Sequence, residues 1–151
     1  MIILASKSPR RRQLLSMMGL DFIVQTADID ETMDKSQTPA HEVAAVSARK
    51  AAKIAAMHPD DVIVSADTIV VIDGKILGKP KDEADAIHMI SSFQGKIHQV
   101  YTGVTLVFCG KPGENPSEQW KTITFAEKTD VHVCPMTMEQ IKAYVRTGES
   151  M

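Results

Sequence analysis

The chain has 151 residues, of which 44% are hydrophobic, and its formal net charge is -2. A chain of this length is expected to form one domain, or one domain with two lobes, around a substantial core. The small negative charge argues against a nucleic-acid polycation, so any anion binding must come from local clusters of charge. No apolar run is long enough to span a bilayer, and Cys109 and Cys134 form no CxxC motif. We therefore expect a cytoplasmic protein with reduced thiols and no membrane association.

The first third of the chain predicts two strands and two helices. Ser8 and Pro9 suit the cap and the first position of a helix, and Gly19 suits its end. Thr38 and Pro39 begin a second helix by the same chemistry, and the apolar residues that follow have a helical period. The predicted elements are a strand at 2–5, a helix from 9 to 18, a strand at 22–24 and a helix from 39 to the turn before residue 59.

The rest of the chain alternates between strand and helix signals. The β-rich segments 62–64 and 68–72 are separated by Asp67, and Asp73-Gly74 is a strong hairpin signal before a return strand at 75–77. Asp82 caps the next helix, which Gly95 closes, and Thr137 begins the last one. Strands are expected at 100–108 and 120–133, antiparallel to each other, with a turn-rich loop at 110–117. This order predicts an α/β fold with a mixed sheet.

Three adjacent arginines, Arg10, Arg11 and Arg12, stand at the start of the first predicted helix. Like charges there oppose the helix dipole, at a cost of roughly 0.3–1 kcal/mol per exposed charge. A bound polyanion would neutralise them, and a helix start offers free N–H groups to phosphate oxygens. From these residues alone, an anion site and a solvated basic turn are equally good interpretations.

The remaining polar signals are a carboxylate and two lysines. Asp67 either caps a turn or lies at a strand end in a cleft, and we favour the cleft, where it could hold a hard cation or take a proton from water. Lys50 can reach solvent from its helix or point into a site. Lys79 follows a β-rich segment, and an exposed loop is its simpler interpretation. No GxxxxGK[ST], GxGxxG, GxSxG or HExxH motif occurs. These parts suggest an enzyme that acts on nucleotides or phosphate esters.

Five segments then occur in a recognisable order: LASKSPRRRQLL, DIDET, ARKAAKIA, SADTIVVIDGKILGKPKD and FQGKIHQVYTG. Together they resemble the Maf family, known as septum-formation proteins and as nucleoside triphosphate pyrophosphatases. The resemblance runs from Leu4 to about Gly103 and is weaker beyond. It implies a fold similar to that of inosine triphosphate pyrophosphatases, with a mixed central sheet, flanking helices and two lobes around a cleft.

The resemblance also implies a reaction and a site. The family hydrolyses a nucleoside triphosphate between its α and β phosphates with a divalent cation, Mg²⁺ or Mn²⁺. By motif, Asp67 would accept the proton of the attacking water, and Glu31 with Asp67 would hold the metal. Ala66-Asp67-Thr68 resembles the branch that acts on dTTP and UTP, and modified pyrimidine nucleotides are further candidates. The positions expected to bind the substrate are Ser6, Arg10, Arg11, Lys50, Thr68 and Lys79.

Two alternatives stay open at this point. Members of the family continue beyond TGESM through a segment resembling DKAGAYGIQG, so we expect a single Maf-like domain over 1–151 that lacks this C-terminal segment. The chain could then be an inactive homologue that only binds nucleotide, and an incomplete sheet would favour a homodimer. It could also be a division-related regulator that binds nucleic acid through SPRRR, although its charge and its 5% aromatic content disfavour this.

Overall fold

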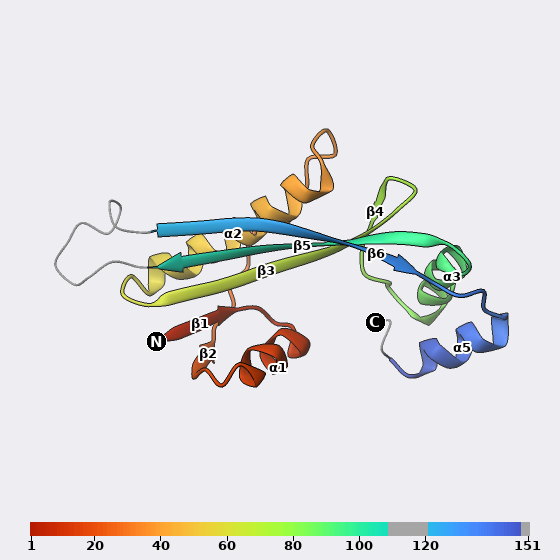
Figure 1. The fold of residues 1–151 in the computed structure, drawn as a ribbon, viewed down its shortest axis with the longest axis horizontal. Helices are drawn as coiled ribbons and strands as arrows, with labels where there is room; N and C mark the ends of the chain where they lie inside the picture. Colours follow the sequence, from red (N-terminus) through yellow and green to blue (C-terminus); the bar gives the residue numbers. More distant parts are fainter. Residues whose placement is uncertain (109–120, 149–151) are drawn as a thin grey trace. The chain divides into compact units, whose positions relative to one another are not determined.

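The computed structural model describes residues 1–108 and 121–148 and has a mixed α/β architecture (Figure 1). The loop predicted at 110–117 lies outside the described residues. Within them, no helix is long and apolar enough to cross a membrane. The elements are β1 (Ile2–Ala5), α1 (Pro9–Met17), β2 (Phe22–Val24), α2 (Pro39–Met57), β3 (Val62–Ile72), β4 (Lys75–Leu77), α3 (Glu83–Phe93), β5 (Ile97–Phe108), β6 (Lys121–His132) and α5 (Met138–Arg146).

The strands form one mixed sheet in the order β2-β1-β3-β5-β6, with β4 paired to β3. β1 is parallel to both β2 and β3, whereas β3 and β4 are antiparallel. The turn between β3 and β4 has positive φ angles at Asp73 and Gly74, 51° and 76°, as the predicted hairpin requires. Because the sheet contains both parallel and antiparallel pairs, the predicted mixed sheet is confirmed.

Two sequence-based expectations about the strands were wrong. Asp67 does not separate two strands, because β3 runs unbroken from Val62 to Ile72. A strand can pass through a carboxylate when the side chain points to one face and meets a cation there, and this is the case at Asp67. β5 also begins at Ile97, three residues before the predicted start at Val100.

The chain folds as two compact units, the first made of residues 1–68 and 102–127 and the second of residues 69–101 and 128–151. In the first unit, α2 packs its apolar face on the sheet. α1 contributes no buried residue. The core cluster of the first unit consists of Ile3, Ala5, Ala51, Ile54, Ala55, Ile63 and Val107.

Gly103 of β5 lies directly against the backbone of α2 within the first unit. A Cβ atom built on Gly103 would lie 2.3 Å from the Val43 carbonyl oxygen and 2.7 Å from the Ala44 nitrogen. These are backbone atoms of the first turns of α2, so they cannot move without shifting the helix. Glycine at 103 therefore sets how closely α2 approaches the strands that carry the site described below.

The second unit is held by α3 and α5, which pack against each other. Asp82 caps α3 by accepting a hydrogen bond from the Asp85 amide, and Thr137 with Gln140 forms the predicted capping box of α5. His98 of β5 is buried and stacks on Phe93 with ring centroids 4.4 Å apart. Its Nδ1 atom has no hydrogen-bond partner among the described residues, and burial lowers the pKa of His98 below its usual 6.5.

We expect Gly103→Ala to destabilise the protein by roughly 2–3 kcal/mol, because the new methyl group would force α2 off the sheet. The free energy of unfolding in urea measures the effect. Gly78→Ala is the matched control, since nothing lies within 4 Å of a Cβ atom at that position. Equal stabilities of the two variants would contradict the close approach.

We also expect stability to fall as the pH drops below about 6.5. The unfolded state binds a proton at His98 near that pH, whereas the folded state resists it because the pKa is lowered. Acid thus favours unfolding, and His98→Leu should flatten the decline in melting temperature between pH 6.5 and 5. A matched change at the exposed His132 should leave the decline unchanged. A decline that is identical in wild type and His98→Leu would show that another group causes it.

Candidate functional site

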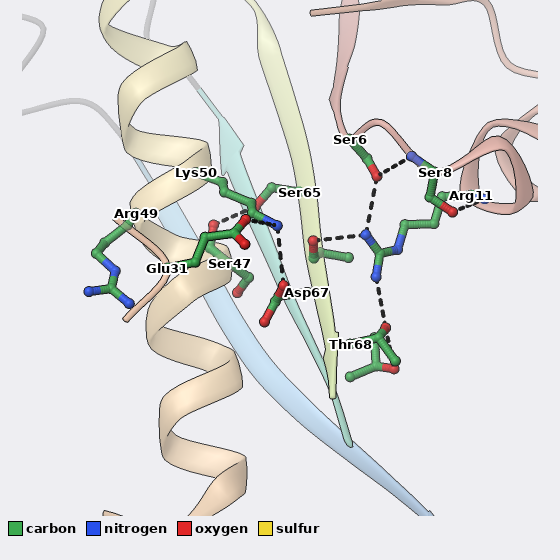
Figure 2. Close-up of polar contacts among 12 residues, drawn as sticks. Ser6, Ser8, Arg11, Glu31, Ser47, Arg49, Lys50, Ser65, Asp67 and Thr68 are labelled. Carbon is green, nitrogen blue, oxygen red and sulfur yellow. Dashed lines mark hydrogen bonds and ion pairs between the residues drawn. The ribbon is translucent and has the colours of Figure 1, made fainter. Parts of the chain in front are cut away.

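Lys50 of α2 joins two of the predicted acidic residues in the first unit. Its Nζ atom lies 3.2 Å from Asp67 Oδ1 and 3.1 Å from Glu31 Oε1 (Figure 2). The side chains of Lys50 and Asp67 are 19% and 14% exposed, whereas Glu31 is 59% exposed. Water therefore screens the Lys50–Asp67 pair only weakly, and each charge depends on the other.

Buried hydroxyl groups hold α2 against β3 next to this cluster. Ser65 donates a hydrogen bond to the Ser47 carbonyl oxygen at 2.5 Å, and the Ser47 and Thr105 hydroxyls lie 2.7 Å apart. All three side chains are fully buried. Ser65 precedes Asp67 by two residues, so both side chains point to the α2 face of the strand. Ser47 precedes Lys50 by about one helical turn, so this contact helps to place both ends of the ion pair.

A second cluster forms around Arg11 at the start of α1. Its Nη1 donates to Ser6 Oγ at 3.1 Å and to the Ala66 carbonyl oxygen at 3.0 Å, and its Nη2 donates to Thr68 Oγ1 at 2.7 Å (Figure 2). The Thr68 hydroxyl also lies 3.0 Å from that of Thr102 on β5. Burial lowers the pKa of Arg11, and the negative charge of Asp67 opposes that effect. Arg11 thus ties the loop after β1 to the middle of β3.

The two clusters lie on either side of β3 because successive side chains in a strand point to opposite faces. Figure 2 shows Asp67 directed toward α2 and Thr68 directed toward the start of α1. One short segment of β3, residues 66–68, therefore contacts both clusters. Ser8 shapes the loop that brings Arg11 there, since its side chain caps α1 by accepting from the Arg11 amide at 3.4 Å.

A pocket of about 310 Å³ opens beside the Lys50 cluster in the first unit. Lys7 in its wall forms an ion pair with Asp28 at 3.6 Å, and Lys53 donates a hydrogen bond to the Asp28 carbonyl oxygen. Cationic and hydroxyl groups facing carboxylates suit an anionic ligand that arrives with a cation. The lining residues are Ala5, Ser6, Lys7, Thr26, Ala27, Asp28, Ile29, Glu31, Lys50 and Ile54.

The structure brings most of the predicted site residues together, but not all. Ser6, Glu31 and Lys50 line the pocket, and Asp67 contacts it through the Lys50 ammonium. Arg11 and Thr68 belong to the second cluster. Arg10 is exposed beside it, and Lys79 is exposed in the second unit, after β4. Neither makes a side-chain hydrogen bond or ion pair with the described residues.

Sequence reasoning missed several residues of the site, chiefly Ser47, Ser65 and Thr102. The signal for Ser65 was present, because a residue two positions before Asp67 in a strand shares its face. Lys7 belongs to the predicted anion loop, although it was not among the positions expected to bind the substrate. Ser47 and Thr102 had no local signal, since their roles depend on strands and a helix that lie far apart in sequence.

Two carboxylates are the donors available for a hard divalent cation. The described residues contain no group of three or more His, Cys, Asp and Glu side chains suited to a metal. Glu31 and Asp67 nonetheless each place a carboxylate oxygen within 3.2 Å of a single point, the Lys50 nitrogen. Mg²⁺ commonly takes one or two carboxylates and completes its shell with water and substrate phosphates. Two carboxylates that face one cation are the donor type that such an ion uses.

Comparison with known proteins supports the resemblance over the whole chain. The Maf-like protein family model matches residues 1–151. A dTTP/UTP pyrophosphatase of Bacillus cytotoxicus is 40% identical over 149 residues, 99% of this chain and 73% of that protein. A dTTP/UTP pyrophosphatase of Pelotomaculum thermopropionicum is 42% identical over 150 residues, 99% of this chain and 74% of that protein.

A solved structure supports the fold. A HAM1 protein from Coxiella burnetii superposes with a TM-score of 0.52 at 12% identity and covers 87% of this chain and 71% of that one. At this identity the likeness concerns the fold alone, and it agrees with the predicted α/β architecture. From its match over all 151 residues, the chain belongs to the Maf-like protein family.

Proposed function

We propose that this protein hydrolyses dTTP and UTP to the nucleoside monophosphate and pyrophosphate. The observation that carries the proposal is the Lys50 ammonium between Glu31 and Asp67 at the edge of a pocket whose wall also holds Ser6 and Lys7. Relatives about 40% identical over nearly the whole chain are named for this activity. The triplet Ala66-Asp67-Thr68 supports the pyrimidine branch.

The proposed chemistry is attack by water on the α-phosphorus. The water oxygen forms the new bond to phosphorus, the bond to the oxygen bridging the α and β phosphates breaks, and pyrophosphate leaves with that oxygen. Asp67 takes the proton of the attacking water, a role that suits a carboxylate next to Lys50, which lines the pocket. A positioned general base contributes about 10²–10⁴-fold to such a rate.

The anionic tail of the substrate needs cationic and hydrogen-bonding partners. Ser6 and Lys50 line the pocket and are proposed to contact phosphate oxygens, with Arg10, Arg11 and Lys79 as further phosphate ligands. A Mg²⁺ or Mn²⁺ ion, held by Glu31 and Asp67, would neutralise charge on the phosphates when bound.

Base selection is proposed to lie at the second cluster. The Thr68 hydroxyl accepts from Arg11 and lies 3.0 Å from the Thr102 hydroxyl, so its orientation is fixed by two neighbours. A fixed hydroxyl at this position presents one defined hydrogen-bonding pattern to a base edge, whereas a longer amide side chain would present another. This difference supports a preference for pyrimidine nucleotides, including modified ones.

Three further proposals accompany this function. We infer that residues 1–151 act as a single Maf-like domain and that it works in the cytoplasm. A homodimer is supported by β6, which is the last strand of the sheet as described and exposes 40% of Ile123 and 45% of Phe125. An open strand edge with apolar side chains favours pairing with a second chain.

Asp67→Asn should lower kcat for dTTP at least about 100-fold, because the amide keeps the shape of the carboxylate but cannot take a proton. Release of pyrophosphate from dTTP and UTP in the presence of Mg²⁺ or Mn²⁺ measures the effect. Asp60→Asn, at an exposed position on the loop before β3, serves as the control and should retain full activity.

Two results would contradict the proposal. If wild-type protein with metal releases no pyrophosphate from any nucleotide, the chain is not this enzyme. If UTP then still raises the melting temperature, the chain is a nucleotide-binding homologue without turnover. If the wild type is active but Asp67→Asn keeps more than a tenth of that activity, Asp67 is not the proton acceptor.

A further inference from the structure

The Lys50 ammonium occupies the place between the two carboxylates proposed to hold the metal. Its distances to Glu31 Oε1 and Asp67 Oδ1 differ by only 0.1 Å, 3.1 Å against 3.2 Å. A divalent ion bound by both carboxylates would compete with the ammonium for the same two negative charges. An ammonium and a divalent cation next to the same carboxylates repel each other, so the two do not pair with them equally well at the same time.

We propose that Lys50 is an exchangeable counter-ion of the metal site. Without nucleotide, its ammonium pairs with Glu31 and Asp67 and competes with a divalent cation for them. When an anionic substrate enters, the ammonium leaves the carboxylates for the phosphates, and the cation takes its place. This inference rests on the proposed metal site of the proposed function, and it adds that Lys50 itself opposes metal binding in the absence of substrate.

The positions of the groups allow such an exchange. Lys50 lines the pocket beside Ser6 and Lys7, so its ammonium has an open space to enter. A lysine side chain has four flexible carbons and can turn without any movement of the backbone. The backbone of α2 is fixed nearby by the Ser65–Ser47 hydrogen bond. The exchange therefore requires only a rotation of the side chain.

The net charge of the site explains why the cation would bind once Lys50 has left. The two carboxylates of Glu31 and Asp67 together with the Lys50 ammonium carry a net charge of -1. Without the ammonium, the two carboxylates carry a charge of -2. A site of charge -2 attracts a divalent cation more strongly than a site of charge -1. A triphosphate would draw Lys50 away, because it offers several anionic oxygens at once. Metal and nucleotide would thus bind together, and neither carboxylate would be left without a cation.

The proposed competition is tested by measuring how tightly the full chain binds Mn²⁺ in the absence of nucleotide. The electron paramagnetic resonance signal of free Mn²⁺ reports how much of the ion remains unbound. We expect Lys50→Met to bind Mn²⁺ roughly tenfold or more tightly than wild type, because the competing charge is gone. Lys53→Met is the matched control. It removes the same charge one turn further along α2, where the exposed ammonium bonds to the Asp28 carbonyl oxygen. The Mn²⁺ affinity of Lys53→Met should stay within about twofold of the wild-type affinity, since salt screens exposed charges.

Two results would overturn the proposal. The first is that Lys50→Met binds Mn²⁺ no more tightly than Lys53→Met does. The second is that the double variant Lys50→Met/Asp67→Asn keeps the tighter binding, because the ion would then lie elsewhere. Lys50→Gln repeats the test with a polar side chain in case the methionine variant does not fold, as judged by circular dichroism. The measurement needs no turnover. A failure of pyrophosphate release in wild type would therefore refute the proposed function and leave the exchange to be judged by Mn²⁺ binding alone.

Discussion

The organisation of the first unit depends on one positive charge, the Lys50 ammonium, held between Glu31 and Asp67. Asp67 lies in the middle of a strand whose neighbouring residues are mostly apolar, and its side chain is only 14% exposed. A carboxylate there requires a partner, since an isolated buried charge is very costly. Lys50 supplies it from α2, and the pair links the helix to the strand at the edge of the pocket.

That link needs α2 to lie close to β3 and β5, and two uncharged features provide this. Gly103 lets the helix backbone approach β5 with no side chain between them. The Ser65 hydroxyl donates to the Ser47 carbonyl oxygen of α2, and the hydroxyls of Ser47 and Thr105 pair with each other. A larger residue at 103 would push the helix away from β5, and Lys50 would move with it. The close packing of α2 on the strands therefore sets the distance between Lys50 and Asp67.

The three adjacent arginines have different environments. Arg11 turns inward and uses its planar group to join Ser6, Ala66 and Thr68, a set of contacts that a single ammonium could not make. Arg10 and Arg12 remain exposed. The like charges at the start of α1 are therefore explained in part by a structural cross-link, which reduces the basic patch that a nucleic acid would meet.

The local elements follow from the sequence alone, because caps, turns and periodicity act over a few residues. Ser8, Thr38, Asp82 and Thr137 all cap the helices they were expected to cap, and Asp73-Gly74 forms the expected hairpin. The ordered motifs also identified the family. Three features of the site became evident only from the packed fold: Asp67 lies within a continuous strand, Lys50 bridges it to Glu31, and Arg11 binds Thr68. These contacts join residues 17 to 57 positions apart, and pairings at that separation follow from how α2 and the strands pack, not from any local pattern.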